Sequence, residues 1–249
     1  SIGSTMSNAF GIPSWIVGIV LVIICGFVFL GNLQRLASLT EQIVPIMAAI
    51  LFIGALIVLI ARIQYIPETF RMIFYYAFNP EAILGGGLGS ALKIAISQGA
   101  KRGLFSNEAG MGSTPHAHAL AQVKHPHEQG VVAIVAVFLD TFVVLTLNAL
   151  VIISTLYTPD GPLAQGYLLN KGNLAQTAFG IVFGEELGAI FIAITLFFFA
   201  FSTIISWNLF AKINVDYLSK GKLVLPFNIL ALVFIFLGTL ASNDLVWEL

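Results

Sequence analysis

Long runs of apolar residues, each about as long as a membrane-spanning helix, dominate this sequence. A helix needs about 20 apolar residues to cross the hydrocarbon core of a bilayer. Five runs meet this requirement, at residues 13–31, 42–61, 130–157, 187–209 and 223–241. The pattern therefore predicts an all-α integral membrane protein.

The stretch between the second and third runs is apolar but interrupted. Within residues 82–122, Ala-rich half-segments flank the polar centre "RGLFSNEAGMGS" (residues 102–113). We interpret residues 88–122 as a sixth, broken crossing. The alternative is a polar loop outside the membrane that joins two short interfacial helices. We expect residues 1–249 to form one transmembrane domain, incomplete at both ends, from a longer membrane protein.

The connections between the runs complete a topology. Residues 32–40 and 210–222 are interpreted as polar links, residues 62–81 as an amphipathic interfacial piece, and residues 158–186 as an external loop with a short helix. The loops on one side carry five basic residues and those on the other carry three: Arg35, Lys124, Lys212, Lys220 and Lys222 against Arg62, Arg71 and Lys171. Because basic loops favour the cytoplasm, the first side is expected to face it.

The composition agrees with a membrane protein. Hydrophobic residues make up 58% of the chain and charged residues 9%, whereas about a quarter of the residues of a soluble domain are charged. The net charge of −1 gives no reason to expect a nucleic-acid partner. The single Cys25 cannot form an internal disulfide. We expect a multi-pass protein of the cell membrane, surrounded by lipid.

The polar centre at residues 102–113 contains groups suited to ligand binding. Irregular backbone at membrane depth is tolerated only where it is buried in protein or lines a cavity. Gly110 and Gly112 allow the chain to leave helical geometry. Unwound carbonyl groups can then coordinate a cation, and the N–H groups that open a half-helix favour a carboxylate. Asn107 adds a side chain that donates and accepts hydrogen bonds, so this stretch suits an amino acid.

A second polar group, "FSTIISW" (residues 201–207), lies inside an otherwise apolar run. Thr203 and Trp207 are four residues apart and therefore share a helix face, with Ser202 beside them. The hydroxyl groups can bind Na⁺ or a substrate carboxylate, and the indole can wall a small pocket. The alternative is that Ser and Thr bond back to their own helix and that the Trp belongs to an interfacial belt.

Asp140, in "FLDTFVV", is the most costly side chain within the clear runs. A central Asp costs about 2.5–3.5 kcal/mol on membrane-insertion scales. We favour a structural ion pair between Asp140 and Arg102, or its neighbour Lys101; the functional alternative is a proton or ion relay.

These motifs together resemble one family. "RGLFSNEAGMGS", the "HP…QG" turn at residues 125–130 and the Asp-Thr pair of "FLDTFVV" closely resemble the alanine/glycine:cation symporter family, the sodium:alanine symporters. "FSTIISW" and "LQRLASLTEQIVPIMA" are similar to corresponding segments of that family. The resemblance extends through essentially the whole chain.

The resemblance implies a LeuT-type inverted-repeat fold with ten core helices, of which this chain covers about helices 4 to 9. It implies a secondary active symporter rather than an enzyme, coupling entry of Na⁺ or H⁺ to uptake of small neutral amino acids, alanine or glycine, by alternating access. No cofactor is expected besides Na⁺ as coupling ion. Helix 1, which supplies roughly half of such a site, lies outside this chain.

The resemblance also assigns roles to individual residues. The expected substrate-binding residues are Asn107, Gly110, Met111, Thr203 and Trp207. Ser202 and Thr203 are the expected Na⁺ ligands. A Met and a Trp around the substrate side chain would exclude bulky amino acids. The family usually has an apolar residue at the position of His116, so "TPHAHALA" is more polar than expected.

Two other kinds of function are considered. Four histidines, His116, His118, His125 and His127, fall close together, and imidazole clusters bind Zn²⁺. No carboxylate or Cys completes a recognisable ligand spacing, so no metal site is expected. A glycine-rich broken helix could also line a channel, and another amino-acid transporter of the same fold is the remaining alternative.

Overall fold

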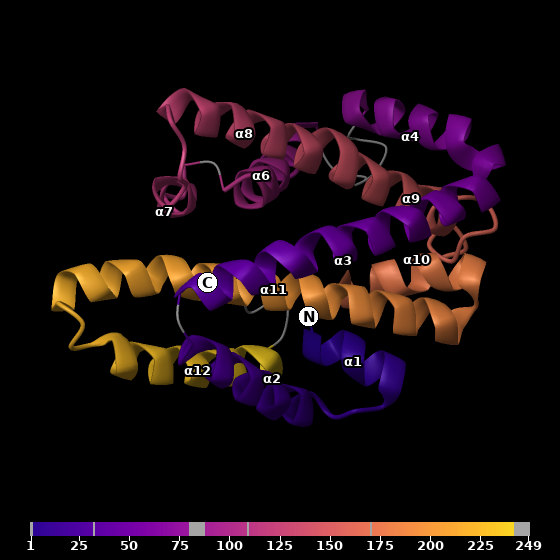
Figure 1. Cartoon of the computed structure of the whole chain (residues 1–249). Helices are drawn as coiled ribbons and strands as arrows, with labels where there is room; N and C mark the ends of the chain where they lie inside the picture. The colour runs from indigo at the N-terminus through magenta and orange to yellow at the C-terminus, as the bar shows by residue number, and fades with distance from the viewer. Residues whose placement is uncertain (1, 32, 80–87, 109, 170, 242–249) are drawn as a thin grey trace. The chain divides into compact units, whose positions relative to one another are not determined.

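The computed structural model describes residues 2–31, 33–79, 88–108, 110–169 and 171–241, and regular secondary structure in these ranges is helical (Figure 1). The chain divides into two compact units. The first unit comprises Ser1–Val58 and Pro162–Leu249, and the second comprises Leu59–Gly161. Each unit is described by itself below.

The first unit is built around α11, the longest helix. Its helices are α1 (Ile2–Phe10), α2 (Ser14–Phe29), most of α3 (Leu33–Ala61), α10 (Leu174–Phe183), α11 (Glu185–Ser219) and α12 (Val224–Leu240). Leu21, Cys25 and Phe29 of α2 recur every four residues, which puts them on one helix face. They form a buried core with Phe201 and Ile205 of α11. Figure 1 shows α2 and α12 side by side.

A close glycine contact joins α10 to α11. A Cβ atom on Gly188 would clash with the backbone nitrogen of Gly180. Gly184, between the two helices, has a φ of 89°, which side chains rarely tolerate. Gln176 of α10 is buried, and its side-chain amide donates to the backbone carbonyls of Thr5 and Ala189. This hairpin is therefore fixed by backbone-to-backbone packing as well as by hydrogen bonds.

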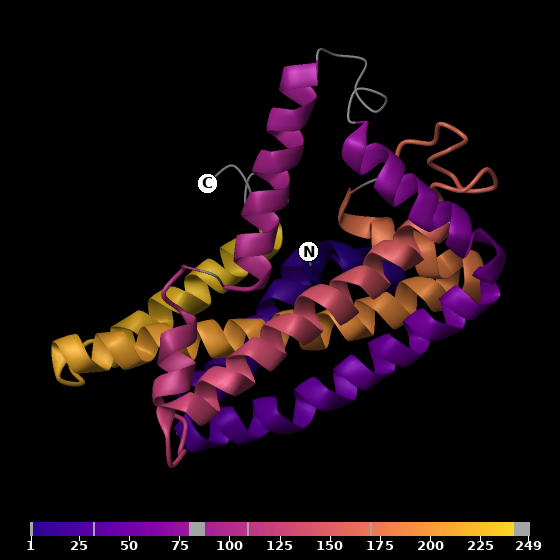
Figure 2. The same cartoon turned by 90° about the horizontal axis from the view of Figure 1, so that it is seen from above.

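The second unit contains a long helical rod with a change of helix type in its middle. Its elements are η1 (Ile63–Tyr65), α4 (Ile66–Phe78), α6 (Leu88–Ser106), α7 (Thr114–Ala119), α8 (Pro126–Phe138), η2 (Leu139–Leu145) and α9 (Thr146–Leu156). The segment η2 is a π-helix, and Figure 2 shows that it continues from α8 into α9. Such π-helical turns are rare and often occur at functional sites.

A buried arginine ties the chain after α3 to the turn after α9. The Arg62 guanidinium donates to both carboxylate oxygens of Asp160, at 2.7 and 2.8 Å, and to the Thr158 hydroxyl at 2.8 Å. Its Nε donates to the Ser154 carbonyl at 3.0 Å, and the Tyr65 ring lies 4.1 Å from the guanidinium carbon. These partners lie more than 90 residues along the chain from Arg62, apart from Tyr65, so the contact closes a large loop.

The helices match most of the predicted runs. Within the described residues, three helical segments are long and apolar enough to cross a membrane: Gln42–Ala61, Pro126–Leu156 and Glu185–Ser219. The runs at 13–31 and 223–241 correspond to the shorter apolar helices α2 and α12. The short helix expected within residues 158–186 is confirmed as α10. These apolar helices are those of a multi-pass membrane protein.

Two predicted links are wrong. The polar link at residues 32–40 is helical from Leu33, where α3 begins, and the link at 210–222 is helical to Ser219, where α11 ends. Hydropathy measures how strongly a segment prefers lipid. A helix can continue beyond its apolar segment when the next residues have high helix propensity. Leu, Gln, Arg and Ala, which begin α3, are good helix formers.

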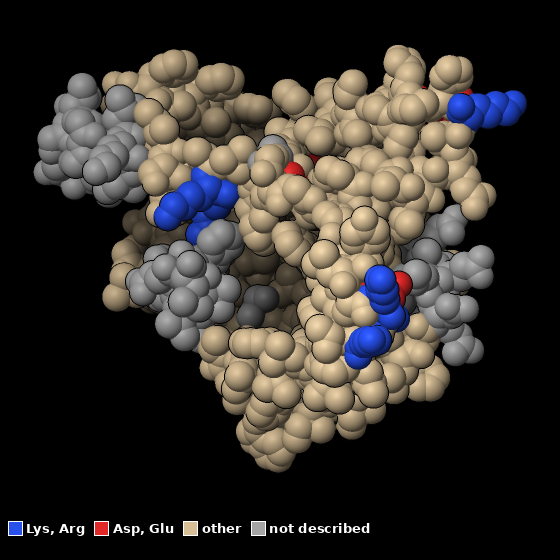
Figure 3. All heavy atoms as spheres, turned by 90° about the vertical axis from the view of Figure 1, so that its left-hand side faces the viewer, with Lys and Arg blue, Asp and Glu red and all other residues tan. Residues whose placement is uncertain are grey.

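Much of the described surface is uncharged. Figure 3 shows one face on which Lys, Arg, Asp and Glu occupy only small areas. Ile23, Phe27 and Ile134 are 66%, 74% and 72% exposed. Such side chains need an apolar environment, which lipid or further protein supplies.

Candidate functional site

The backbone leaves helical geometry within the polar centre that the sequence singles out. The helix α6 ends at Ser106 and α7 begins at Thr114. Between them, Glu108, Gly110 and Gly112 have φ values of 51°, 75° and 79°, in the left-handed region. The predicted break between two helical segments is confirmed; its depth in a membrane stays a prediction.

Two neighbouring side chains at the start of the break bond to two neighbouring side chains of the π-helix. The Ser106 hydroxyl donates to Oδ2 of Asp140 at 2.6 Å. The Thr141 hydroxyl donates to Oδ1 of Asn107 at 3.0 Å. A carboxylate, two hydroxyls and an amide thus gather where α6 ends, and Asn107 is half-buried there. This arrangement places oxygen atoms beside the irregular backbone.

The π-helix is a feature that the sequence interpretation missed. Its backbone hydrogen bonds span five residues instead of four, which leaves no trace in hydropathy. The available signal was the pair of polar residues Asp140 and Thr141, which interrupts an apolar run. The structure shows that this pair lies in the π-helical turn and faces the break.

The structure gives Asp140 a partner other than the one expected. Its carboxylate accepts from Ser106, which lies one turn after Arg102 in α6. The ion pair between Arg102 and Asp140 stays a prediction. The nearby Glu108 accepts from two hydroxyls, those of Ser113 and Thr114, at 2.8 and 3.2 Å.

The second predicted group lies within an unbroken part of α11. The hydroxyls of Ser202 and Thr203 both donate to the backbone carbonyl of Phe199, each at 2.9 Å. This is the back-bonding that we considered as the alternative. Ser202 is buried, Thr203 is exposed and Trp207 is half-buried. Their roles in binding Na⁺ or substrate stay predictions.

The two groups belong to different units. Asn107, Gly110 and Met111 lie in the second unit, whereas Ser202, Thr203 and Trp207 lie in the first. Met111 is 43% exposed, and a Cβ atom on Gly110 would meet no atom within 4 Å in the described ranges. Both are therefore open to a ligand or a further segment. That the two groups meet at one substrate stays a prediction.

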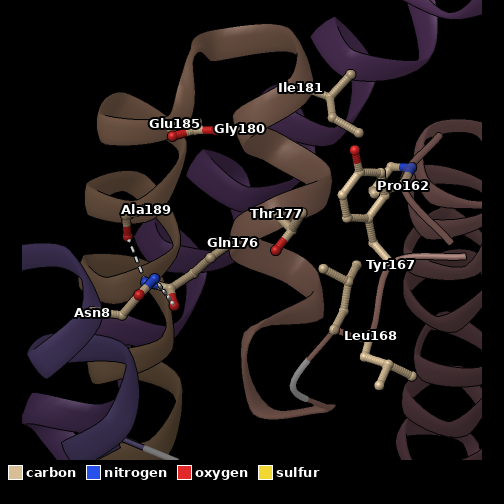
Figure 4. A pocket seen from close by; sticks show the side chains of 11 residues that line it. Asn8, Pro162, Tyr167, Leu168, Gln176, Thr177, Gly180, Ile181, Glu185 and Ala189 are labelled. Atoms are coloured by element: carbon tan, nitrogen blue, oxygen red, sulfur yellow. Dashed lines mark hydrogen bonds between the residues drawn. The ribbon is translucent and has the colours of Figure 1, made fainter. Parts of the chain in front are cut away.

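A separate cavity in the first unit contains none of the predicted residues. It has a volume of about 530 Å³ and lies between α1, α10, the start of α11 and residues 162–169 (Figure 4). Gln176, at one side, accepts from Asn8 at 3.1 Å and donates to Ala189. Because the hydrogen bonds of its side chain hold α10 against α1 and α11, Gln176 is structural.

The histidine region contains a polar contact but no metal-ligand group among the residues described. His118 pairs with Gln129 at 2.7 Å, which joins α7 to the first turns of α8. Nδ1 of His116 lies 3.1 Å from the Ser113 carbonyl. In the described ranges, no three His, Cys, Asp or Glu side chains cluster as metal ligands would.

Known proteins provide an independent comparison. Residues 1–249 match the family described as the sodium:alanine symporter family. The chain is 37% identical to a "sodium/proton-dependent alanine carrier protein" of Bacillus sp. (strain PS3), covering all of this chain and 58% of the relative. It is 35% identical to the "sodium/alanine symporter AgcS" of Methanococcus maripaludis, and the match covers 100% of this chain and 53% of that relative.

A third relative has a different substrate in its name. The "probable sodium/glutamine symporter GlnT" of Bacillus subtilis is 34% identical, over all of this chain and 50% of its own length. The chain thus spans about half the length of these curated relatives. Since the family match extends from the first residue to the last, this chain belongs to the sodium:alanine symporter family.

Proposed function

We propose that the protein is a secondary active symporter of the cell membrane. It couples entry of Na⁺, or H⁺, to uptake of a small neutral amino acid, alanine or glycine, by alternating access. The names of two relatives pair sodium with alanine, which supports the proposal. The observation that carries it is the break between α6 and α7, whose open backbone adjoins the side chains of Asp140 and Thr141.

The break suits the two charged ends of an amino acid. Unwound backbone offers carbonyl groups to a cation and N–H groups to a carboxylate. Gly110 has no side chain, and a Cβ added there would meet no described atom within 4 Å, so a small ligand can approach its backbone. Asn107 and Met111 complete the proposed substrate contacts in this unit. Thr203 and Trp207 supply the contacts from α11.

The proposed Na⁺ ligands are oxygen atoms. Ser202 and Thr203 present hydroxyls on α11, whose bonds to Phe199 leave their oxygen lone pairs able to accept a cation. At the break, Asp140 adds a negative charge beside Ser106 and Asn107. A carboxylate in the membrane is costly unless a cation or a hydrogen bond compensates it. A cation near Asp140 therefore lowers that cost.

The fold that fits this function is the LeuT-type inverted repeat. In that fold the chain supplies about helices 4 to 9, with the break as the unwound centre of helix 6. The helical break, followed by a long rod and then by α11, is the order that this fold requires. Helix 1 would supply the remaining half of the site.

Uptake by the full-length protein in proteoliposomes tests the proposal. Labelled alanine is expected to accumulate under an inward Na⁺ gradient, to saturate, and to compete with glycine. Glutamine as competitor tests the substrate that the name of the third relative suggests. Ohmic current without any amino acid would instead indicate a channel. Trp207→Ala is expected to admit larger amino acids.

Matched variants test the site itself. Gly110→Ala should strongly reduce uptake, because φ is 75° there, whereas Gly130→Ala should not, because Gly130 is helical and has open space around it. Asn107→Ala should likewise reduce uptake, compared with Asn148→Ala on α9. Normal uptake in both site variants would remove residues 107–111 from the site.

A further inference from the structure

Glu108 has an unusual backbone for its residue type. Its φ is 51°, and among the described residues other than glycine only Lys220 shares a positive φ. Side chains are disfavoured in the left-handed region, and they persist there when surrounding contacts hold them. The side chain of Glu108 makes contacts of this kind.

The Glu108 carboxylate spans the break. Its Oε2 accepts from the Ser113 hydroxyl at 2.8 Å and from the Thr114 hydroxyl at 3.2 Å. Ser113 precedes α7 and is 6% exposed, and Thr114 is the first residue of that helix. Hydrogen bonds to a charged acceptor are stronger than those between neutral groups. We call this arrangement the Glu108 bridge, formed by Glu108, Ser113 and Thr114.

The bridge encloses open backbone. Among the residues that the structure describes, leaving out the chain neighbours, no atom lies within 4 Å of a Cβ added to Gly110 or Gly112, which lie between its two ends, so side-chain packing does not fix them. The backbone N–H of Met111 reaches the Glu108 carbonyl only at 3.4 Å. The shape of residues 110–112 therefore depends largely on the carboxylate that joins the two ends of this short loop.

We infer that Glu108 is a positioning residue of the substrate site. Its bridge holds Gly110 and Met111 in the conformation that receives the amino acid, without touching the amino acid itself. This inference rests on the proposed function, because it takes Asn107, Gly110 and Met111 as substrate contacts. It assigns to Glu108 a role in substrate affinity.

Uptake kinetics of the full-length protein in proteoliposomes test the role in affinity. Glu108→Ala is expected to raise the KM for alanine about tenfold or more, with a smaller change in maximal rate, because a charge-assisted pair is lost. The double variant Ser113→Ala, Thr114→Val should raise KM by a similar factor. Combining all three substitutions should do no more than Glu108→Ala alone, because they remove the same contact.

Conservative and control variants separate positioning from folding. Glu108→Gln keeps an oxygen that accepts both hydroxyls, so it should recover most of the affinity. Glu128→Ala, at an exposed site in the first turn of α8, should leave KM unchanged. An unchanged KM in the double variant, or effects that multiply in the triple variant, would overturn the inference.

Hydrogen–deuterium exchange gives a readout that does not depend on transport. The amides of residues 110–112 should exchange faster in Glu108→Ala and in the double variant than in the wild type, and at the wild-type rate in Glu128→Ala. Absence of Na⁺-dependent alanine uptake by the wild type would defeat the proposed function alone. Unchanged exchange in the bridge variants would defeat the bridge, whatever the substrate.

Discussion

The hydroxyls of Ser202 and Thr203 in α11 bond within their own helix, whereas Ser106 and Asn107 at the break bond across to another helix. Ser202 and Thr203 both donate to Phe199, three and four residues earlier. Ser106 and Asn107 bond to Asp140 and Thr141, 34 residues away. A hydroxyl of the first kind can turn to a ligand without releasing a tertiary contact. A side chain of the second kind shapes the site through the contact it makes.

The largest effect should come from the longest-range contact in the second unit. Arg62→Met takes a charged donor from the buried Ser154 carbonyl and Thr158 hydroxyl, and is expected to destabilise the fold by about 2–4 kcal/mol. Thermal unfolding in detergent micelles measures this. The matched variant is Arg71→Met, because Arg71 pairs with Glu68 on the exposed side of α4 and should matter little. Equal stability of the two variants would show that distance along the chain is not the deciding factor.

Breaking the contact between the break and the π-helix should affect uptake. Asp140→Ala removes a hydrogen bond to a charged group, worth about 1.5–3 kcal/mol, so alanine uptake efficiency should fall about 10- to 150-fold. Ser106→Ala should act in the same direction through the same contact. The measurement is initial uptake rate over a range of alanine concentrations. If Thr195→Ala, which removes a bond to Phe191 within α11, matched either loss, the contrast between the two regions would disappear.

Replacing a buried amide in α11 is expected to raise stability instead of lowering it. Both polar atoms of the Asn208 side chain are buried without a hydrogen-bond partner among the residues that the structure describes, and the residue is 6% exposed. Replacing it by Leu removes an unsatisfied group, so Asn208→Leu should raise stability by at least about 1 kcal/mol. Thermal unfolding shows the change, with Asn214→Leu on the exposed side of α11 as reference. A lower unfolding temperature would mean that Asn208 has a bound partner.

The helix-internal hydroxyl should matter for the ion and little for the fold. Thr203→Val removes only the hydrogen bond to Phe199, so the free energy of unfolding should change by less than about 1 kcal/mol. If Thr203 binds Na⁺, the Na⁺ concentration for half-maximal uptake should rise roughly tenfold, equivalent to about 1.4 kcal/mol. The Na⁺ dependence of alanine uptake is the test. A normal Na⁺ dependence would leave Thr203 with its structural bond alone.

The smallest expected effect is a loss of stability at acidic pH through the pair of Arg62 and Asp160. The Arg62 guanidinium holds the pKa of Asp160 well below its ordinary value, with help from the Thr158 hydroxyl. The contribution to stability is therefore complete above the unfolded pKa of about 4 and is lost as pH falls towards the lower folded value. Unfolding temperatures between pH 5 and 3 should fall more for the wild type than for Asp160→Asn. Because Asp160 is 47% exposed, the difference is expected to be small.

The sequence predicted the apolar helices well because lipid imposes both length and composition on them. The runs at 13–31 and 223–241 agree closely with α2 and α12. The start of α3 and the end of α11 were missed, because residues outside the apolar runs still have high helix propensity.

Glycines at 110 and 112 predicted the break because they tolerate a backbone that other residues resist. The hydrogen-bond partners of the polar side chains could not be predicted from the sequence. The contact of Asp140 with Ser106, and that of Glu108 with two hydroxyls, depend on tertiary placement that spacing along the chain does not specify. The π-helix depends on backbone bonding, which composition does not reveal.

The π-helical turn at Leu139–Leu145 makes the length of this rod part of the site. A π-helical turn contains an additional residue compared with an α-helical one. Deleting one residue, such as Val143, would allow continuous α-helix and turn Asp140 and Thr141 by about 100° relative to the face of Val151 and Thr155. Both side chains that contact the break would still be present in such a chain, but they would point in another direction. The deletion therefore separates the identity of these residues from their orientation.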